Sequence, residues 1–319
     1  MAAKRFSTLA AGVGMLMGAA EGKSALLLID VQDCFMSDAT LTANGQAGSL
    51  GVDAASIIPV INSIRSEKSC LFDKVFLTRD FHPKNHISFA STHGLEPFAH
   101  TTGLGGLPIM CTKPDSGSTN DASCCPKSYV DKSSVDCTKS LCPPDTWDYD
   151  TDNAEYVSNS LACTTCKINA ASCYTDTQMM WTDHCLQTGD SGLIPSLTVE
   201  DTDIIVKKGQ NVFVDAYSAF MDNSGNLKTE LDDMLQAEGI TTLYIAGIAT
   251  DVCVQWTVRD ALSESTGSYT VKLISDACAG ITDEGHASAL AEMATWSGVT
   301  VMTSEDILAM TCEAEATPT

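Results

Sequence analysis

The chain is poor in basic residues. It has 18 lysines and arginines against 41 aspartates and glutamates in 319 residues, which gives a formal net charge of −23. A surface this acidic repels nucleic-acid phosphates and anionic lipid headgroups, so we expect neither nucleic acid nor a membrane surface as a partner. Charged residues are scarce overall, at 18% beside 44% hydrophobic residues. This balance excludes global disorder and predicts a packed core.

Beyond the first twenty residues, the sequence has no apolar stretch long enough to span a bilayer. Within residues 1–20, Lys4 and Arg5 precede an uncharged run, 6–20, that ends in small residues. This pattern predicts a secretory signal peptide that is cleaved near Ala19 and Ala20, and hence a secreted protein. The run also contains Ser and Thr but no acid, so a transit peptide to an organelle is the alternative.

Regular periodicity is missing from residues 101–180, which are rich in Ser, Thr, Asp, Pro, Gly and Cys. An unstructured loop of this length is unusual inside a compact domain, so we interpret 101–180 as an inserted subdomain held by disulfides. A zinc module around Cys163 and Cys166 is a second interpretation, although a second C-x-x-C pair is absent, and a redox pair is a third. The insertion holds eight of the fourteen cysteines: Cys111, Cys124, Cys125, Cys137, Cys142, Cys163, Cys166 and Cys173.

Short apolar runs on both sides of the insertion predict the strands of a parallel sheet. Helical patterns alternate with them, and the clearest places Ile57, Ile58, Ile61 and Ile64 on one face. We therefore predict an α/β protein with a three-layer, Rossmann-like fold, formed by 21–100 and 181–312 and followed by a tail, 313–319. The expected strands are 25–30, 74–79, 203–206, 242–248, 271–274 and 299–302, and the other expected helices are 227–237, 253–263 and 284–296.

Reactive side chains follow four of these strands. Asp30 ends the first, Asp80 and His82 follow the second, Lys208 follows the third, and Cys253 follows the fourth at the start of a helix. Because ligands bind beyond the carboxyl ends of parallel strands, we expect these side chains to converge at one edge of the sheet.

Cys253 is the candidate nucleophile. A helix N-terminus favours the thiolate and lowers the thiol pKa, and its free N–H groups can hold an oxyanion. Asp30 would take the proton of the thiol, and Lys208 would stabilise the charges. Each residue alone has an ordinary alternative, since buried cysteines are usually inert, strand-end aspartates often cap, and lysines are usually solvated.

A second group of side chains suits a metal ion. Asp80 and His82 are two residues apart, His86 lies four further on, and His184 is another histidine source. A carboxylate and imidazoles bind zinc, iron or manganese, and three protein ligands leave a position for water or substrate. The D-x-H spacing alone is a weak signal, because such pairs are common by chance.

Five motifs in one order resemble the isochorismatase-like cysteine hydrolases, and specifically their nicotinamidase/pyrazinamidase branch. Together they cover roughly two hundred residues on both sides of the insertion, and the set is specific although each motif alone is not. They are LLLIDVQDCF ending at Phe35, TRDFHPKNHISFAS at 78–91, WTDHCLQTG at 181–189, VKKGQNVFVDAYSAF at 206–220 and GIATDVCVQWTVRDA at 247–261.

The resemblance implies a role for each matching residue. Cys253 would be the nucleophile, Asp30 its general base and Lys208 the third member of the triad. A cis peptide bond would join Ile248 to Ala249, and the N–H groups of Ala249 and Cys253 would form the oxyanion hole. One divalent metal ion would bind to Asp80, His82 and His184, with His86 as a further candidate ligand. Zinc is the preferred metal, and iron or manganese are the alternatives. The aromatic walls of the substrate pocket would be Phe35, Trp181 and Tyr217.

The implied activity is hydrolysis of a small amide, nicotinamide, to nicotinate and ammonia through a cysteine thioester. The ring nitrogen would bind the metal, which would orient the substrate. Another C–N hydrolase of the superfamily, acting on a carbamoyl or ureido compound, and a catalytically silent secreted binding protein are the alternatives. The state of assembly stays open, and a homo-oligomer is compatible with the sequence.

The sequence departs from the family pattern at three places. Cys34 stands where the family commonly has an acid, and Thr182 stands where it has proline. The interval between His82 and His184 is about twice the expected length, so the insertion enters beside the metal site. If Cys253 is set aside, an odd number of cysteines remains, so at least one more thiol stays free or pairs between chains.

Overall fold

The computed structural model describes residues 22–36, 48, 50–84, 86, 88–93, 96–98, 179–189, 191–211, 215–223 and 227–312. The predicted signal peptide, the tail and all of the insertion except Met179 and Met180 lie outside these residues. The part of the chain that is described contains no helix with the length and apolar character needed to cross a membrane.

A six-stranded, fully parallel sheet forms the centre of the fold, in the order β3-β2-β1-β4-β5-β6. Its inner strands are almost continuously apolar, as expected where helices cover both faces; β1, for example, buries its last five residues. The strands are β1 (Lys23–Ile29), β2 (Lys74–Asp80), β3 (Ile204–Lys208), β4 (Ile240–Ile248), β5 (Thr270–Ala279) and β6 (Val299–Met302).

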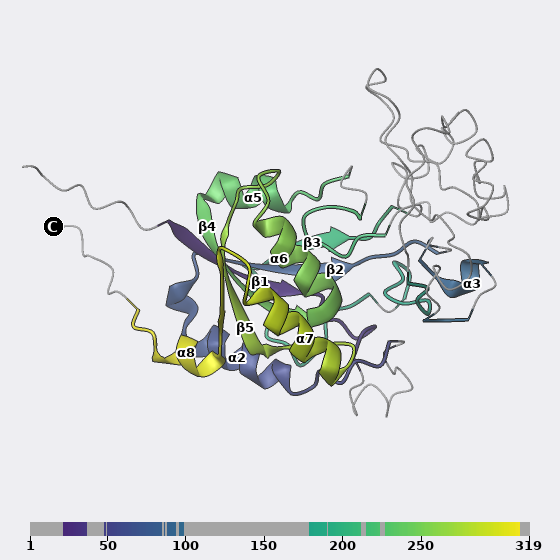
Figure 1. Ribbon diagram of the computed structural model, residues 1–319, viewed down its shortest axis with the longest axis horizontal. Helices are drawn as coiled ribbons and strands as arrows, with labels where there is room; N and C mark the ends of the chain where they lie inside the picture. The colour runs from purple at the N-terminus through teal and green to yellow at the C-terminus, as the bar shows by residue number, and fades with distance from the viewer. Residues whose placement is uncertain are drawn as a thin grey trace, which may run out of the picture.

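Helices cover the two faces of the sheet (Figure 1). Helix α2 packs against α8 and β5 on one side, while α6 packs against α7 on the other, near the turn that follows β4. The isoleucines that share a face in the sequence pattern are all buried in α2, together with Arg65. The helices are α2 (Ile57–Glu67), η1 (Ser69–Leu71), α3 (Ala90–His93), α5 (Leu231–Glu238), η6 (Thr250–Val254), α6 (Gln255–Ala261), α7 (Asp283–Met293) and α8 (Ser304–Ala309).

The predicted three-layer α/β fold is confirmed, with corrections to single elements. Helix α8 was not predicted, although Thr303 and Asp306 form a capping box at its start. The helix expected from residue 227 begins at Leu231, because Lys228 instead forms an isolated bridge with Met221. The helix expected from Cys253 is preceded by a π-helical turn, η6, which contains Cys253 itself.

The strand order positions the site. From β1 the chain passes outward to β2 and β3, and then returns to the other side of β1 to form β4. The connections that follow β1 and β4 therefore diverge, which leaves a crevice beyond the carboxyl ends of these two strands. Asp30 follows β1 at this point, and Ala249 follows β4.

Candidate active site

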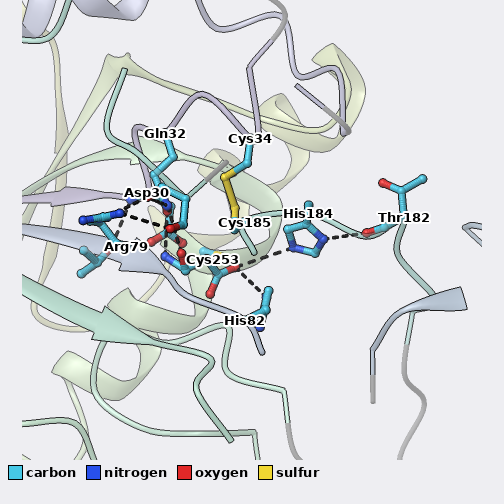
Figure 2. Close-up of a disulfide and its surroundings, with 12 residues drawn as sticks. Asp30, Gln32, Cys34, Arg79, His82, Thr182, His184, Cys185 and Cys253 are labelled. Carbon is cyan, nitrogen blue, oxygen red and sulfur yellow. Dashed lines mark hydrogen bonds and ion pairs between the residues drawn. A yellow bond between two sulfur atoms is a disulfide. The ribbon is translucent and has the colours of Figure 1, made fainter. Parts of the chain in front are cut away.

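The crevice brings together the four reactive residues that the sequence analysis places after four different strands. Asp30 follows β1, Asp80 ends β2, Lys208 ends β3, and Cys253 lies in the turn after β4. All four are almost fully buried. Figure 2 shows Asp30, Cys253, His82 and His184 around one small space.

Lys208 is the centre of this group. Its Nζ atom lies 2.9 Å from Oδ2 of Asp30, 2.8 Å from Oδ1 of Asp80 and 3.6 Å from Sγ of Cys253. It also donates a hydrogen bond of 2.9 Å to the carbonyl oxygen of Ala216. Burial lowers the pKa of Lys208, but the two carboxylates raise it more, so its pKa lies well above the usual value. The ammonium group therefore stays charged and neutralises part of the buried acid.

Asp30 is placed to accept a proton. Thr78 Oγ1 donates a 2.6 Å hydrogen bond to Oδ1, which leaves Oδ2 facing Lys208. Burial raises the pKa of Asp30, Lys208 lowers it and Asp80 raises it, and the net direction is upward. A carboxylate whose affinity for protons is raised by burial is suited to general-base chemistry.

Cys253 has a different electrostatic environment from the one that the sequence predicts. Burial raises the pKa of its thiol well above the usual value; Lys208 lowers it, while Asp30 and Asp80 raise it. The expected lowering by a helix N-terminus is wrong in its net effect, because desolvation of the thiolate outweighs it. The thiol is therefore protonated in the free site and needs a base when it reacts.

The peptide bond just before this turn is cis, between Ile248 and Ala249, as the family resemblance implies. In the π-helical turn that follows, the carbonyl oxygen of Ala249 accepts hydrogen bonds from the N–H groups of both Val252 and Val254. Ala249 and Cys253 both line the pocket described below.

Asp80 lies close to both predicted histidine donors, His82 and His184. Oδ2 of Asp80 lies 3.2 Å from Nε2 of His82 and 3.8 Å from Nε2 of His184. The opposite ring nitrogens face backbone carbonyls, with Nδ1 of His82 at 2.8 Å from Gly209 O and Nδ1 of His184 at 2.7 Å from Thr182 O. Carbonyl oxygens only accept, so each Nδ1 carries a hydrogen and each Nε2 faces Asp80, where its lone pair would be available to a metal ion. This orientation fits a divalent metal ion.

His86 and Asp215 lie beside His82. The ring centroid of His86 is 4.1 Å from that of His82, and its Nδ1 atom is 2.7 Å from Oγ of Ser88. Donor atoms of His82, His86 and Asp215 lie within 4.8 Å of one another. Asp215 was not predicted, although it is an acid two residues before Tyr217 in a motif already singled out.

A small pocket connects the nucleophile to the donors Asp80 and His184. The three aromatic residues predicted to wall it, Phe35, Trp181 and Tyr217, all line it, and the rings of Trp181 and Tyr217 meet edge to face at 6.3 Å. Leu50, Val252 and Ile281 add apolar surface that the sequence analysis did not identify. The complete lining is Phe35, Leu50, Asp80, Trp181, His184, Asp215, Tyr217, Ala249, Val252, Cys253 and Ile281.

Comparison with known proteins assigns this arrangement to a family. The model of the isochorismatase domain matches residues 140–306, which is more than half of the chain. The chain belongs to the isochorismatase family. Its relatives include a nicotinamidase of Acinetobacter baylyi, 30% identical over 285 residues that cover 89% of this chain and 94% of the relative. A nicotinamidase of Escherichia coli is 30% identical over 272 residues, which cover 84% of this chain and 89% of that protein.

Solved structures of the family agree with the fold. The nicotinamidase/pyrazinamidase of Acinetobacter baumanii superposes with a TM-score of 0.58 at 28% identity, covering 91% of this chain and 100% of that one. The predicted resemblance to the nicotinamidase branch of the isochorismatase family is therefore confirmed.

One departure from the family pattern has a structural explanation. Cys34, which replaces the common acid, forms a buried disulfide with Cys185. A second disulfide joins Cys70 to Cys312. Cys253 and Cys278 are the free cysteines among the residues that the structure describes. The expectation that one further thiol stays free is thus confirmed by Cys278.

Proposed function

We propose that this chain is a nicotinamidase, which hydrolyses nicotinamide to nicotinate and ammonia. The observation that supports it best is a single pocket, lined by aromatic side chains, that contains both Cys253 and the donor pair Asp80–His184. A flat pyridine ring fits between the aromatic walls with its carboxamide at the thiol. The nicotinamidases that are 30% identical over most of this chain support the same substrate.

In the first half of the reaction, Asp30 takes the proton of the Cys253 thiol while Sγ attacks the carboxamide carbon. Lys208 contacts both groups, so it holds them in place and offsets the negative charge that passes between them. The N–H groups of Ala249 and Cys253 stabilise the oxyanion. Asp30 then gives its proton to the leaving nitrogen, ammonia departs, and the acyl group remains on Cys253 as a thioester.

In the second half, Asp30 takes a proton from water, which attacks the thioester carbon. The carbon–sulfur bond breaks, nicotinate is released, and the thiol recovers its proton from Asp30. The raised pKa of Asp30 suits this alternation between base and acid.

Asp80, His82 and His184 would hold one divalent metal ion, with zinc preferred because two imidazoles and a carboxylate are a common zinc set. When bound, the ion supplies a Lewis acid for the ring nitrogen of the substrate. His86 is a further candidate ligand, and burial together with the charge of His82 holds its pKa well below the usual value. A neutral imidazole is the form that binds metals.

Ammonia release from nicotinamide by the purified protein tests the proposal, with and without a chelator. Benzamide, which has the same carboxamide but no ring nitrogen, is the matched control substrate. We expect chelator-sensitive release from nicotinamide and much weaker release from benzamide. Equal rates for both amides would contradict the role of the ring nitrogen, and no release with zinc bound and Cys253 reduced would contradict the activity.

We further propose that the protein works in an oxidising compartment, as a secreted enzyme or in the lumen of the secretory pathway. The pairing of Cys34 with Cys185 and of Cys70 with Cys312 supports this location, because such bonds persist mainly under oxidising conditions. Thiol counting on denatured, unreduced protein should find few free thiols. A count near fourteen, the full number of cysteines, would contradict the proposal.

A further inference from the structure

A buried disulfide lies against the candidate active site. Cys34 and Cys185 are 1% and 0% exposed, and their Cα atoms are 5.1 Å apart although 151 residues separate them in sequence. Figure 2 shows the bond between the segment that carries Asp30 and Gln32 and the segment that carries His184. The bond therefore joins the chain after β1 to the chain that supplies a metal donor.

Each cysteine is the direct neighbour of a pocket residue. Phe35 follows Cys34, and His184 precedes Cys185; both neighbours line the pocket with Cys253. The ring centroids of Phe35 and His184 are 5.3 Å apart. One covalent bond thus fixes an aromatic wall and a metal donor relative to each other.

His184 is a donor for which such an anchor matters. It comes only four residues after the predicted insertion, 101–180. Two backbone hydrogen bonds connect its segment to His82. The N–H of His82 donates to Cys185 O at 2.9 Å, and the N–H of Gln187 donates to His82 O at 3.0 Å. A crosslink between residues so distant in sequence removes conformations in which these two hydrogen bonds are broken.

Gln32 explains why the Cys34 side is a firm anchor. Its buried side chain accepts a 2.7 Å hydrogen bond from the N–H of Asp80 and donates 3.0 Å and 2.9 Å bonds to the carbonyls of Asp80 and Ser191. The segment that carries Cys34 is therefore already fixed to the strand end that carries Asp80. Through the disulfide, His184 is fixed to the same point as its fellow donor.

We propose that the Cys34–Cys185 disulfide is a positioning element of the active site, which holds His184 and Phe35 where the metal ion and the substrate ring need them. The proposal rests on the metal-dependent nicotinamidase function proposed above. Cys34 and Cys185 are positioning residues, since they act through His184 and Phe35 and do not take part in bond making.

The test compares two double variants, each of which removes one disulfide. Cys34→Ala with Cys185→Ala removes the bond at the site; Cys70→Ala with Cys312→Ala is the matched control, because those residues are absent from the pocket lining. Zinc affinity is measured by competition with a chromogenic chelator, and kcat and KM for nicotinamide are measured at saturating zinc.

For the site variant we expect zinc affinity to fall by about tenfold or more, as for other groups that orient metal ligands. We also expect a raised KM with kcat at saturating zinc within about threefold of wild type, since the triad does not include the disulfide. The control variant should lower the melting temperature but leave zinc affinity and KM unchanged. Unchanged zinc affinity and KM in the site variant would overturn the proposal.

The zinc measurement separates this proposal from the proposed function. If the wild-type protein binds zinc but does not hydrolyse nicotinamide, the function fails while the loss of zinc affinity still tests the positioning role. If the alanine pair does not fold, Cys34→Ser with Cys185→Ser, which nearly preserves side-chain volume, gives the same comparison. Equal zinc affinity in that variant and the wild type would also overturn the proposal.

Discussion

The Nζ atom of Lys208 lies 3.6 Å from Sγ of Cys253, and the same atom contacts the carboxylates of Asp30 and Asp80. One buried cation thus connects the nucleophile and its base to a metal donor. Because burial disfavours the thiolate, the activation of Cys253 depends on this cation and on the general base.

Replacement of Cys253 by Ala should reduce kcat for nicotinamide by roughly a thousandfold or more, because no other group in the pocket can form the thioester. Cys278→Ala is the matched control, since Cys278 is the other buried free thiol of the described residues and does not line the pocket. Steady-state ammonia release measures both. Comparable losses in the two variants would remove Cys253 as the nucleophile.

Asp30→Asn should lower kcat by about a hundredfold to ten-thousandfold, the range associated with loss of a general base. The amide keeps the shape of the carboxylate but accepts protons poorly, so KM should change much less than kcat. Asp276→Asn is a suitable control, because Asp276 lies on β5, away from Asp30. Its carboxylate accepts a hydrogen bond from the N–H of Ser304 at the start of α8. Near-normal kcat for Asp30→Asn would refute the assignment.

Gly209→Ala should disturb the metal donors. Gly209 has φ of +67°, and a Cβ atom there would lie 2.5 Å from Cε1 of His82 and 2.9 Å from Oδ1 of Asp80. We expect zinc affinity to fall by about tenfold to a hundredfold. Gly239→Ala is the matched control, because Gly239 has φ of +73° but open space around it.

Gly239→Ala should cost about 1 kcal/mol of stability through backbone strain and leave zinc affinity intact. The two variants therefore separate the strain of a positive φ, which they share, from the collision with His82 and Asp80, which only Gly209→Ala has. Equal zinc affinities in the two would contradict the close approach of this backbone to the donors.

The stability of the protein should decline above about pH 8.5, the usual thiol pKa. Burial raises the pKa of Cys278 to about 12. Between these values the unfolded chain loses the thiol proton and the folded protein keeps it, so the free energy of unfolding falls by about 1.4 kcal/mol per pH unit for this thiol. Denaturant unfolding at several pH values should show a shallower decline in Cys278→Ala. Parallel slopes would contradict the raised pKa.

The sequence predicts the framework of the site well, because the framework follows from local patterns. Apolar runs identify the strands, and the carboxyl ends of parallel strands lie at one edge. Asp30, Lys208 and Cys253 are therefore expected together before any distance is known. The isoleucines at 57, 58, 61 and 64 likewise identify the buried face of α2 through a period that depends only on helix geometry.

Other features depend on the folded environment and could not be predicted in this way. The direction of the Cys253 pKa depends on a balance between burial, one cation and two carboxylates that only the assembled site defines. The partner of Cys34 is one of many that the cysteine count allows. The π-helical turn at Thr250–Val254 differs from an α-helical turn by one residue per hydrogen bond, which no periodic pattern in so short a segment reveals.

The strand order also has a consequence for how activity develops during folding. β1 and β4 are neighbours in the sheet, although β2 and β3 lie between them in sequence. Asp30 and Cys253 therefore meet only after the chain has closed its longest-range strand pairing, which is the slow kind of contact to form. A folding intermediate that contains β1, β2 and β3 alone would have the base, the lysine and one carboxylate donor, but no nucleophile. Turnover should accordingly be among the last properties that a refolding chain regains.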